Sequence, residues 1–296
     1  MLKILVIGSI NMDYVCTVDE LPKKGETLLS NGFVDSGGGK GANQAVAARR
    51  LGAEVAMIGA VGKDVSGDKL IDSLRKEGIN VDYIKRVDIP TGNAIVTVDK
   101  NGDNTIVVYS GANFQVDEEL INSYEAVIED NDFIILQLEI PMNTVLYSAK
   151  LAKKHGKKVV LNPAPAKELP KEIYEYIDYI TPNETELARI TGIDDIKLAS
   201  KELVNRGAKN VVVTLGEKGS YYLGDGELEV ESFKIEAVDT TAAGDSFNGA
   251  LAVALGEGKS IEEALKYANA VGALTTTKIG AQVSLPYKEE VKEFLK

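Results

Sequence analysis

The residues best suited to chemistry stand in one short stretch, where the small residues Ala242–Gly244 lead directly into Asp245. A helix is predicted to begin here, because apolar residues recur at three- and four-residue spacing and should bury one face: Phe247, Leu251, Ala254 and Leu255. The first N–H groups of a helix have no partner within it, and the helix dipole adds partial positive charge there. Small side chains would leave those N–H groups open to a phosphate oxygen, with the Asp245 carboxylate beside it. An aspartate at a helix start is, however, usually only an N-cap.

A second glycine-rich stretch, Gly37–Gly41, contains Lys40 and opens a predicted helix that runs to about Leu51. It is not a P-loop, because Lys40 is followed by glycine instead of serine or threonine and no core strand precedes it. The stretch is either a turn built from permissive residues or a backbone segment brought close to a polar ligand. The earlier Gly8–Asn11 segment lacks the glycine pattern of a dinucleotide site, which weakens a dehydrogenase interpretation.

Polar residues also follow several predicted strands. They are Asn11 and Asp13 after Leu2–Ile7, Glu139 after Phe133–Leu138, Asn183 and Glu186 after Tyr179–Thr181, and Thr214 to Gly219 after Val211–Val213. Open α/β sheets bind their ligands at the carboxyl ends of their strands. Taken alone, Glu139 could be a solvated loop acid, and Asn183 with Glu186 could form a simple capping box. Together with the two glycine-containing helix starts, these residues are predicted to form one rim. That rim would offer hydrogen-bonding groups to a polyol at one end and phosphate-facing backbone at the other.

The elements that must hold this rim alternate between strand and helix, which predicts a mostly parallel sheet covered on both faces. The remaining predicted strands are Glu54–Val61, Lys158–Leu161 and an antiparallel pair, Tyr221–Leu223 with Leu228–Phe233. The predicted helices are Lys69–Lys76, Asp117–Glu129, Thr144–His155, Glu168–Tyr176 and Lys197–Arg206, two helices after Asp245, and Lys288–Leu295. The second helix after Asp245 should begin at a capping box formed by Ser260 and Glu263.

Two interruptions made only of strands, at about residues 14–36 and 92–109, predict a small accessory sheet inserted into this core. Its strands are expected at Tyr14–Val18, Glu26–Val34, Ala94–Val98 and Thr105–Tyr109, the last two joined by an Asn-Gly turn. A small sheet with apolar alternation needs a partner to cover it, so we expect a lid or a dimer surface. No linker divides the chain, and residues 1–296 are expected to form a single α/β domain.

Composition limits the function classes. A hydrophobic fraction of 44% and a charged fraction of 26% are ordinary for a soluble globular protein with a sizeable core. The formal net charge of -12, with no basic block, argues against a nucleic-acid partner. A single cysteine, Cys16, excludes internal disulfides and fits a reducing compartment. The apolar start Met1–Ile10 is too short to span a membrane and lacks the organisation of a signal peptide, so we expect a cytoplasmic protein without a membrane partner.

These motifs resemble those of the ribokinase group in the PfkB-type carbohydrate kinase family. The resemblance rests on two family signatures, Gly38–Ala45 and Asp239–Ala250, and on the segments Asn162–Ala166, Thr181–Glu186 and Lys278–Gln282. It covers essentially the whole chain, and paired signatures so far apart are highly specific. It implies a ribokinase-like three-layer αβα sandwich with a mostly parallel central sheet and a small inserted β-sheet lid. The implied reaction is ATP-dependent phosphorylation of the terminal (5-) hydroxyl of D-ribose, giving ribose 5-phosphate and ADP.

The resemblance also implies site residues. Asp245 would be the general base, and the N–H groups of Ala242–Asp245 would form the anion hole. The sugar would be bound by Asn11, Met12, Asp13, Gly39, Lys40, Gly41, Asn43, Glu139 and Asp245. ATP would be bound by Asn183, Glu186, Thr214, Leu215, Gly216, Glu217, Lys218, Gly219, Ala243, Gly244 and Asn269. Relatives often have histidine at the position of Asn269. Mg²⁺ would accompany ATP, and K⁺ or another monovalent cation would activate the enzyme near Asp239, Thr241, Thr275, Lys278, Gly280 and Ser284. A homodimer through the lid sheet is also implied.

Three alternatives remain open on the sequence. The chain could be a kinase for another sugar or for a nucleoside, and Tyr14, Phe33 and Tyr109 could supply the aromatic contacts that a nucleoside would need. A phosphorylated sugar would require an extra cation in the pocket, for which Lys40 is the obvious candidate. A non-catalytic sugar- or nucleotide-binding regulator should lack the base or the anion hole, and the sequence retains both.

Overall fold

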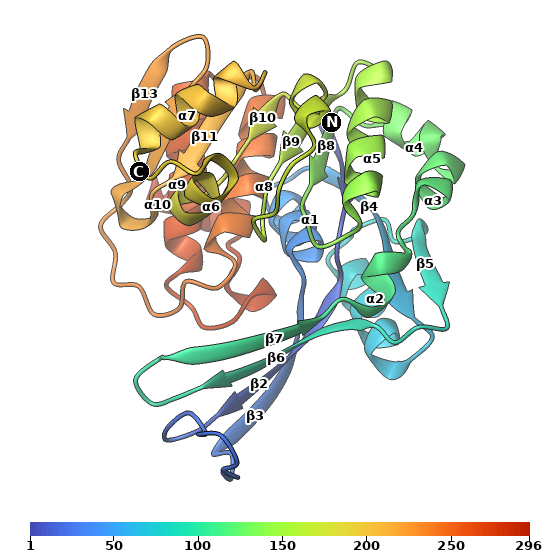
Figure 1. Ribbon diagram of the computed structural model, residues 1–296, viewed down its shortest axis with the longest axis vertical. Helices are drawn as coiled ribbons and strands as arrows, with labels where there is room; N and C mark the ends of the chain where they lie inside the picture. The colour runs from blue at the N-terminus through green and yellow to red at the C-terminus, as the bar shows by residue number, and fades with distance from the viewer.

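A central sheet of nine strands organises the computed structural model, which describes residues 1–296. The strand order is β13-β12-β11-β10-β9-β8-β1-β4-β5 (Figure 1). The bounds are β1 Lys3–Ile7, β4 Glu54–Gly62, β5 Ile84–Val87, β8 Phe133–Leu136, β9 Lys158–Leu161, β10 Tyr179–Ile180, β11 Asn210–Thr214, β12 Ser220–Leu223 and β13 Glu227–Val230. Only the β11-β12-β13 edge is antiparallel, and the predicted mostly parallel sheet is confirmed.

Helices cover both faces of the sheet because successive residues of its strands point to opposite sides. In β1, Ile4 and Val6 join one apolar core cluster, whereas Leu5 and Ile7 join the other. The first cluster packs against α1 Lys40–Arg50, α2 Val65–Lys76, α8 Ala243–Gly256, α9 Ile261–Thr275 and α10 Lys288–Phe294. The second packs against α3 Glu118–Ser123, α4 Glu125–Asp130, α5 Met142–Lys154, α6 Glu184–Thr191 and α7 Ile196–Asn205. The three-layer arrangement expected from the sequence is therefore present.

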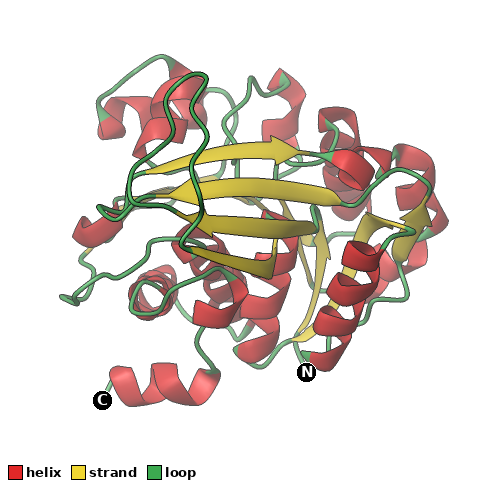
Figure 2. Ribbon diagram, turned by 90° about the horizontal axis from the view of Figure 1, so that it is seen from below, coloured by secondary structure: helices red, strands yellow, loops and turns green.

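A separate sheet of four strands, in the order β3-β2-β6-β7, projects from the body at the bottom of Figure 1. Its strands are β2 Asn11–Thr17, β3 Gly32–Gly38, β6 Gly92–Val98 and β7 Asn104–Tyr109. The outer pairs are antiparallel and the central β2-β6 pair is parallel. Figure 2 shows these strands side by side across the lower face of the molecule. We refer to this four-stranded sheet as the lid sheet.

Several predicted boundaries were wrong. The strand predicted at Glu26–Val34 lies at Gly32–Gly38, because Gly37 and Gly38 pair with β2 instead of forming a turn. β2 begins at Asn11, so Asn11 and Asp13 belong to a strand and not to a loop after β1. The predicted helix Asp117–Glu129 breaks at Tyr124 (φ -116°, ψ 26°) into two short helices. The predicted helix Glu168–Tyr176 is only a 3₁₀ segment, Lys171–Glu175, that follows Pro170.

Three further details differ from expectation. Strand β5 was not predicted, and α2 begins at Val65, where the Asp64 side chain caps it by accepting a hydrogen bond from the Gly67 N–H. Helix α8 does not bury one face only, since residues Asp245–Ala254 are all buried.

The capping box of Ser260 and Glu263 at the start of α9 is confirmed. No helix is both long enough and apolar enough to cross a membrane.

Close packing of α8 against α1 depends on one glycine. A Cβ atom at Gly249 would lie 2.9 Å from Cβ of Ala47 and 3.0 Å from the carbonyl oxygen of Gln44. A larger residue would therefore push the two helices apart, at a cost of about 1–3 kcal/mol. The contact brings the first turn of α8 beside the first turn of α1, and those two turns form the centre of the site described next.

Candidate active site

The start of α8 leaves backbone donors free. Ala242, the residue before the helix, has φ 61° and ψ 7°, and it is the only non-glycine residue of the chain with a positive φ. Such a conformation costs about 1–3 kcal/mol and is typical of functional sites. The N–H groups of Gly244 and Asp245 donate no hydrogen bond within the protein, whereas the Ser246 N–H donates to the Ala242 carbonyl oxygen. Two adjacent amides are thus available to an anion.

Asp245 is not the N-cap of α8. It is the third residue of the helix, and its side chain is buried, with 6% exposure. One carboxylate oxygen, Oδ2, accepts a hydrogen bond from Nδ2 of Asn43 at 2.9 Å. The other, Oδ1, accepts one from Nε2 of Gln44 at 3.0 Å. Helix α1 therefore orients this carboxylate, and the interpretation of Asp245 as a simple cap is wrong.

Helix α1 begins without a side-chain cap of its own. The preceding Gly39 has φ 88°, and a Cβ atom at Gly41 would lie 2.6 Å from the backbone nitrogen of Ser9, so glycine is required for the approach to β1. The Glu139 carboxylate supplies the missing cap, because its Oε2 accepts from the Lys40 N–H at 3.0 Å. The Ser9 hydroxyl donates to the same oxygen at 2.5 Å. Glu139 is therefore fixed against the glycine loop and is not a solvated loop acid.

Two residues of β2 complete this end of the site. Oδ1 of Asn11 accepts from Nδ2 of Asn113 at 2.7 Å, and Oδ1 of Asn113 accepts from the Ile10 N–H at 2.8 Å. The Asp13 carboxylate lies directly over Gly38, where any side chain would clash with it. Met12 points the other way, into the apolar core with 3% exposure, so only its backbone could meet a ligand.

Sequence reasoning missed Ser9, Asn113 and Gln44 as parts of this site. Gln44 stands inside a recognised signature, so its motif was a usable signal. Ser9 and Asn113 come from segments with no motif, and only the tertiary contacts reveal them.

Three carboxylates act on the Lys40 ammonium group, and a fourth, that of Asp13, lies near two of them. Burial, with the nearby charges of Glu139 and Asp245, raises the pKa of Asp13 to about 7. Burial also raises the pKa of Glu186. Asp245 is the largest cause of the raised pKa of Lys40, with Glu139 and Glu186 acting in the same direction against burial. This excess of negative charge favours a cation or hydroxyl donors as ligands.

A pocket of about 710 Å³ lies on the other side of the α8 start. Of the residues predicted to bind ATP, it is lined by Thr214, Gly216, Glu217, Lys218, Gly219, Ala243 and Asn269. Leu215, Gly244, Asn183 and Glu186 are not among its lining residues. Phe233, Ile235 and Phe247 add apolar walls that the sequence did not indicate. The volume and the mixed lining are typical of a small-molecule site.

Asn269 and the Asn183–Glu186 pair are already engaged in structural contacts. Nδ2 of Asn269 donates to the carbonyl oxygens of Val230 and Glu231, which ties α9 to the end of β13. Asn183 and Glu186 form the capping box of α6, in which Oε2 of Glu186 accepts from the Asn183 N–H at 2.9 Å. The capping interpretation of this pair is thus correct, and it leaves Oε1 of Glu186 for other contacts.

Asp239 joins two loops beside α8. Its Oδ1 accepts from the Thr241 N–H at 2.9 Å, and its Oδ2 accepts from the Gly280 N–H at 2.8 Å. Near them, the Thr275 hydroxyl donates to the Val271 carbonyl oxygen and the Ser284 hydroxyl to the Ala281 carbonyl oxygen. The Lys278 ammonium instead pairs with Glu290 at 2.7 Å, so only its backbone could serve a cation here.

The chain contains no cluster of three or more His, Cys, Asp or Glu side chains suited to a metal ion. The oxygen atoms near Asp239 include the hydroxyls of Thr275 and Ser284.

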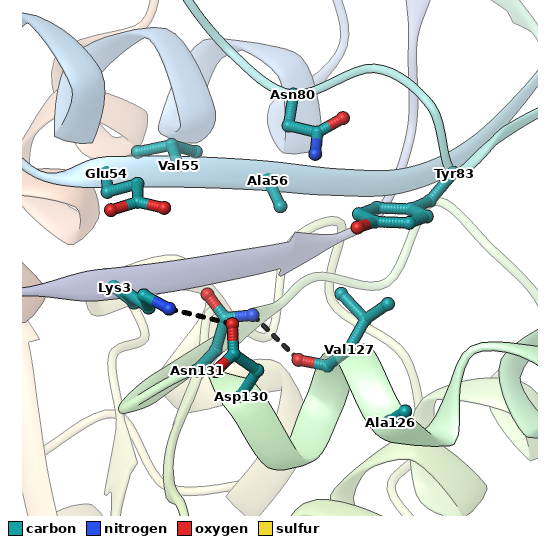
Figure 3. Close-up of a pocket in the computed structure, with 10 residues that line it drawn as sticks. All are labelled: Lys3, Glu54, Val55, Ala56, Asn80, Tyr83, Ala126, Val127, Asp130 and Asn131. Carbon is teal, nitrogen blue, oxygen red and sulfur yellow. Dashed lines mark hydrogen bonds and ion pairs between the residues drawn. The ribbon is translucent and has the colours of Figure 1, made fainter.

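A second pocket, of about 290 Å³, lies far from these residues, at the amino ends of β1 and β4. Figure 3 shows it between Lys3, Asn80, Tyr83 and Asn131, with Lys3 paired to Asp130 at 2.8 Å. The amino ends of parallel strands lie opposite the edge where α/β sheets bind their ligands. This pocket is therefore separate from the candidate active site.

A doubly covered sheet with bare amides, an oriented carboxylate and a neighbouring pocket at one edge defines an α/β phosphoryl-transfer enzyme. The chain matches the model of the pfkB family carbohydrate kinases over residues 1–288, and it belongs to that family.

Relatives and solved structures support the assignment. The chain is 44% identical to a ribokinase of Haemophilus influenzae over 298 residues, covering 98% of this chain and 97% of the relative. It is 39% identical to a deoxyribokinase of Salmonella typhi over 300 residues, covering 99% and 98%. The structure of Arabidopsis thaliana ribokinase complexed with ribose and ATP superposes with a TM-score of 0.93 at 35% identity, covering 100% of this chain and 99% of that one.

The raised pKa of Asp13 predicts that the ionised residue lowers the unfolding free energy of the ligand-free protein. Between the ordinary value of 3.8 and about 7, the folded state holds the proton more tightly than the unfolded state. Asp13 therefore reduces stability progressively as the pH rises through that window, and fully above it. Asp13→Asn should raise the unfolding free energy by about 1–3 kcal/mol at pH 8 but not at pH 4, as measured by urea unfolding without ligand.

The matched control is Asp35→Asn in the neighbouring strand β3. Hydrogen bonding and ion pairing with Lys69 lower the pKa of Asp35, so this variant should lose stability at pH 8 instead of gaining it. Equal stability of wild type and Asp13→Asn at pH 8 would contradict the prediction.

Proposed function

We propose that the protein is an ATP-dependent ribokinase that transfers the γ-phosphoryl group of ATP to the 5-hydroxyl of D-ribose. The observation that carries the proposal is the pair of unpartnered amides at Gly244 and Asp245 beside a carboxylate held by α1. Relatives named ribokinase, similar over their full length, support ribose as the acceptor.

One buried atom supports a hydroxyl-rich ligand. Oδ1 of Asn43 has no hydrogen-bond partner, although Asn43 is only 5% exposed. A buried acceptor without a partner costs about 1–3 kcal/mol, which a ligand hydroxyl would recover. Asn11, Asp13, Lys40, Asn43 and Glu139 then provide a set of acceptors and donors suited to a polyol, with the backbone of Met12, Gly39 and Gly41 lining it.

The proposed mechanism relies on positioning. An Asp245 oxygen accepts the proton of the sugar's primary hydroxyl while the hydroxyl oxygen bonds to the γ-phosphorus and the bond to the ADP oxygen breaks. The N–H groups at the α8 start stabilise the charge on the transferring phosphoryl group. Because α8 is buried along its length, these amides are held in place before the substrate arrives. The nucleotide occupies the pocket lined by Thr214, Gly216–Gly219 and Asn269.

We propose Mg²⁺ as the partner of the ATP phosphates. When bound, it neutralises phosphate charge, and the half-buried Glu186 with its free Oε1 is the residue suited to hold its water shell. The excess of carboxylates in the site fits such a cation.

A panel of acceptors tests the assignment. With ADP release coupled to a spectroscopic readout, ribose should give the highest kcat/KM among ribose, deoxyribose, fructose and adenosine. A site that hydrogen-bonds each sugar hydroxyl should reject an acceptor lacking one by about tenfold or more. A higher kcat/KM for adenosine, or for deoxyribose, would replace the proposed substrate. Deoxyribose is in the panel because the Salmonella typhi relative is named a deoxyribokinase.

Asp245→Asn should lower kcat by about 10²–10⁴, the usual scale for loss of a general base, while ATP binding is kept. Steady-state kinetics and ATP titration would measure the two effects. The control is Asp225→Asn, at an exposed turn of the β12–β13 hairpin. Turnover of Asp245→Asn at the wild-type rate would remove this residue from the mechanism.

We propose that K⁺ binds near Asp239, Thr241, Thr275, Lys278, Gly280 and Ser284 and stiffens the loops next to the anion hole. Replacing KCl by choline chloride at equal ionic strength should lower kcat by about 5- to 150-fold, the usual range for coupling between two sites. Asp239→Asn should remove most of this response, because an amide cannot accept both N–H bonds that join the loops. Equal rates in both salts would refute cation activation.

We also propose a homodimer through the lid sheet. The face of that sheet opposite Asp13 exposes Phe33, Ile95, Val107 and Tyr109, and the neighbouring strand β7 is exposed along its length. Exposed apolar side chains on an edge strand are typical of a surface that a second copy covers. The double variant Ile95→Lys/Val107→Lys should sediment as a monomer, whereas wild type and Leu198→Lys, an exposed position on α7, should sediment as dimers. A monomeric wild type would overturn the proposal.

A further inference from the structure

Behind Asp245 lies a chain of buried side-chain amides. Nε2 of Gln137 donates to Oε1 of Gln44 at 2.7 Å, and Nε2 of Gln44 donates to Oδ1 of Asp245 at 3.0 Å. The Gln44 amide also donates to Oδ1 of Asn162 at 3.1 Å. Gln44 and Gln137 are both fully buried. The chain of hydrogen bonds thus runs from the end of β8, through α1, to α8.

The direction of this chain is set by Gln137. A glutamine amide can present either its NH₂ group or its carbonyl oxygen, and the wrong choice at Gln44 would place an acceptor against the Asp245 carboxylate. Because Gln137 donates to the carbonyl oxygen of Gln44, the NH₂ group of Gln44 is left facing Asp245.

Maintaining that direction has a cost. Oε1 of Gln137 is buried without a hydrogen-bond partner and lies against Gly8, where any Cβ atom would clash with it. Buried polar atoms without partners are rare, and each one in a native structure calls for an explanation. Turning the Gln137 amide over would bring its oxygen against the oxygen of Gln44. Leaving Oε1 of Gln137 without a partner therefore allows its NH₂ group to donate to Gln44.

We propose that Gln44 and Gln137 are positioning residues for phosphoryl transfer, Gln44 by holding the Asp245 carboxylate and Gln137 by fixing the orientation of the Gln44 amide. This inference rests on the proposed function. With Oδ1 held by Gln44 and Oδ2 by Asn43, the carboxylate cannot rotate, and its remaining acceptor position stays directed at the sugar hydroxyl. Since both glutamines are fully buried, the effect belongs to the chemical step and not to binding.

Kinetics of methionine variants test the proposal, because methionine matches glutamine in length but offers no amide. Gln44→Met should lower kcat by about 10- to 100-fold, the scale of a misplaced reacting group, with KM for sugar and ATP within about threefold of wild type. Gln137→Met should lower kcat less, by about 3- to 10-fold. The double variant should be no slower than Gln44→Met alone, because Gln137 acts only through Gln44. Additive losses, or losses in KM alone, would overturn the proposal.

A second variant tests the direction of the donor. Gln137→Glu places a carboxyl group at the same point, and burial near Asp245 should raise the pKa of that new group. When protonated, it donates to Gln44 as the glutamine does. When ionised, it accepts a hydrogen bond from the NH₂ group of Gln44, so the Gln44 amide turns over and its carbonyl oxygen faces Asp245. The kcat of Gln137→Glu relative to wild type should therefore rise as the pH falls. A ratio that does not change with pH would refute the proposed positioning by Gln137 and Gln44, which we call the relay.

A structural control separates positioning from loss of packing. Asn131 is also a buried amide, 5% exposed, which donates to the Val127 carbonyl oxygen on the far side of the sheet. Asn131→Leu should lower the thermal midpoint as the glutamine variants do but leave kcat unchanged. A matching loss of kcat in Asn131→Leu would show that the effect is general destabilisation.

Failure of the relay and failure of the proposed function are distinguishable. Wild type in the acceptor panel tests ribose, whereas the relay is judged from ratios of variant to wild type with the best acceptor that the panel identifies. If ribose is not that acceptor, the proposed function fails and the ratios still decide the role of the two glutamines. If the kcat losses of the two single variants add up in the double variant, or if the kcat ratio of Gln137→Glu does not change with pH, the relay fails and the ribose assignment stands.

Discussion

The close crossing of α1 and α8 is the contact on which the rest of the site depends. Without a side chain at Gly249, the first turns of the two helices approach until Asn43 and Gln44 can hold the Asp245 carboxylate. The same contact buries α8 on nearly all sides and so fixes the direction of its free amides. An anion hole made of backbone is only as rigid as the helix that carries it, and here that helix is surrounded by packed neighbours. The left-handed Ala242 is the strained residue that turns the chain into this helix.

Electrostatics explain why the site is ready for a ligand but unfavourable without one. Glu139, Glu186 and Asp245 act on a single ammonium group, that of Lys40, and Asp13 lies near Glu139 and Asp245. Burial, with repulsion from neighbouring carboxylates, raises the pKa values of Asp13 and Glu186, so folding alone does not favour this arrangement. Under the proposed function, the hydroxyl groups of a sugar and a cation would recover this energy on binding. Glu139 shows the compromise most clearly, since one of its oxygens caps α1 and the other is left for a ligand.

The parts of the site that the sequence could predict are those that depend on local chain geometry. Glycines before Lys40 and small residues before Asp245 mark helix starts, and the parallel sheet follows from the alternation of apolar runs with helices. The cap formed by Glu139 and the support of Asn11 by Asn113 could not be predicted, because they join residues about a hundred positions apart. The position of β3 was misjudged for a related reason. Gly37 and Gly38 look like a turn locally but are held extended by pairing with β2.

That pairing gives the lid sheet two different faces. Asn11 lies opposite Gly38 and Asp13 opposite Ser36, so residues of one parity in β2 face the candidate active site. Residues of the other parity, such as Tyr14 opposite Ile95 on β6, face away from it. A slip of one residue would exchange the two faces and remove Asp13 from the site. In the observed register Gly38 lies beside Asp13, where a glycine leaves room for the carboxylate, and β3 leads directly into α1. The register of the lid sheet and the start of α1 are therefore fixed by the same short segment, which places the carboxylate of Asp13 and the glycine loop of Lys40 on one rim.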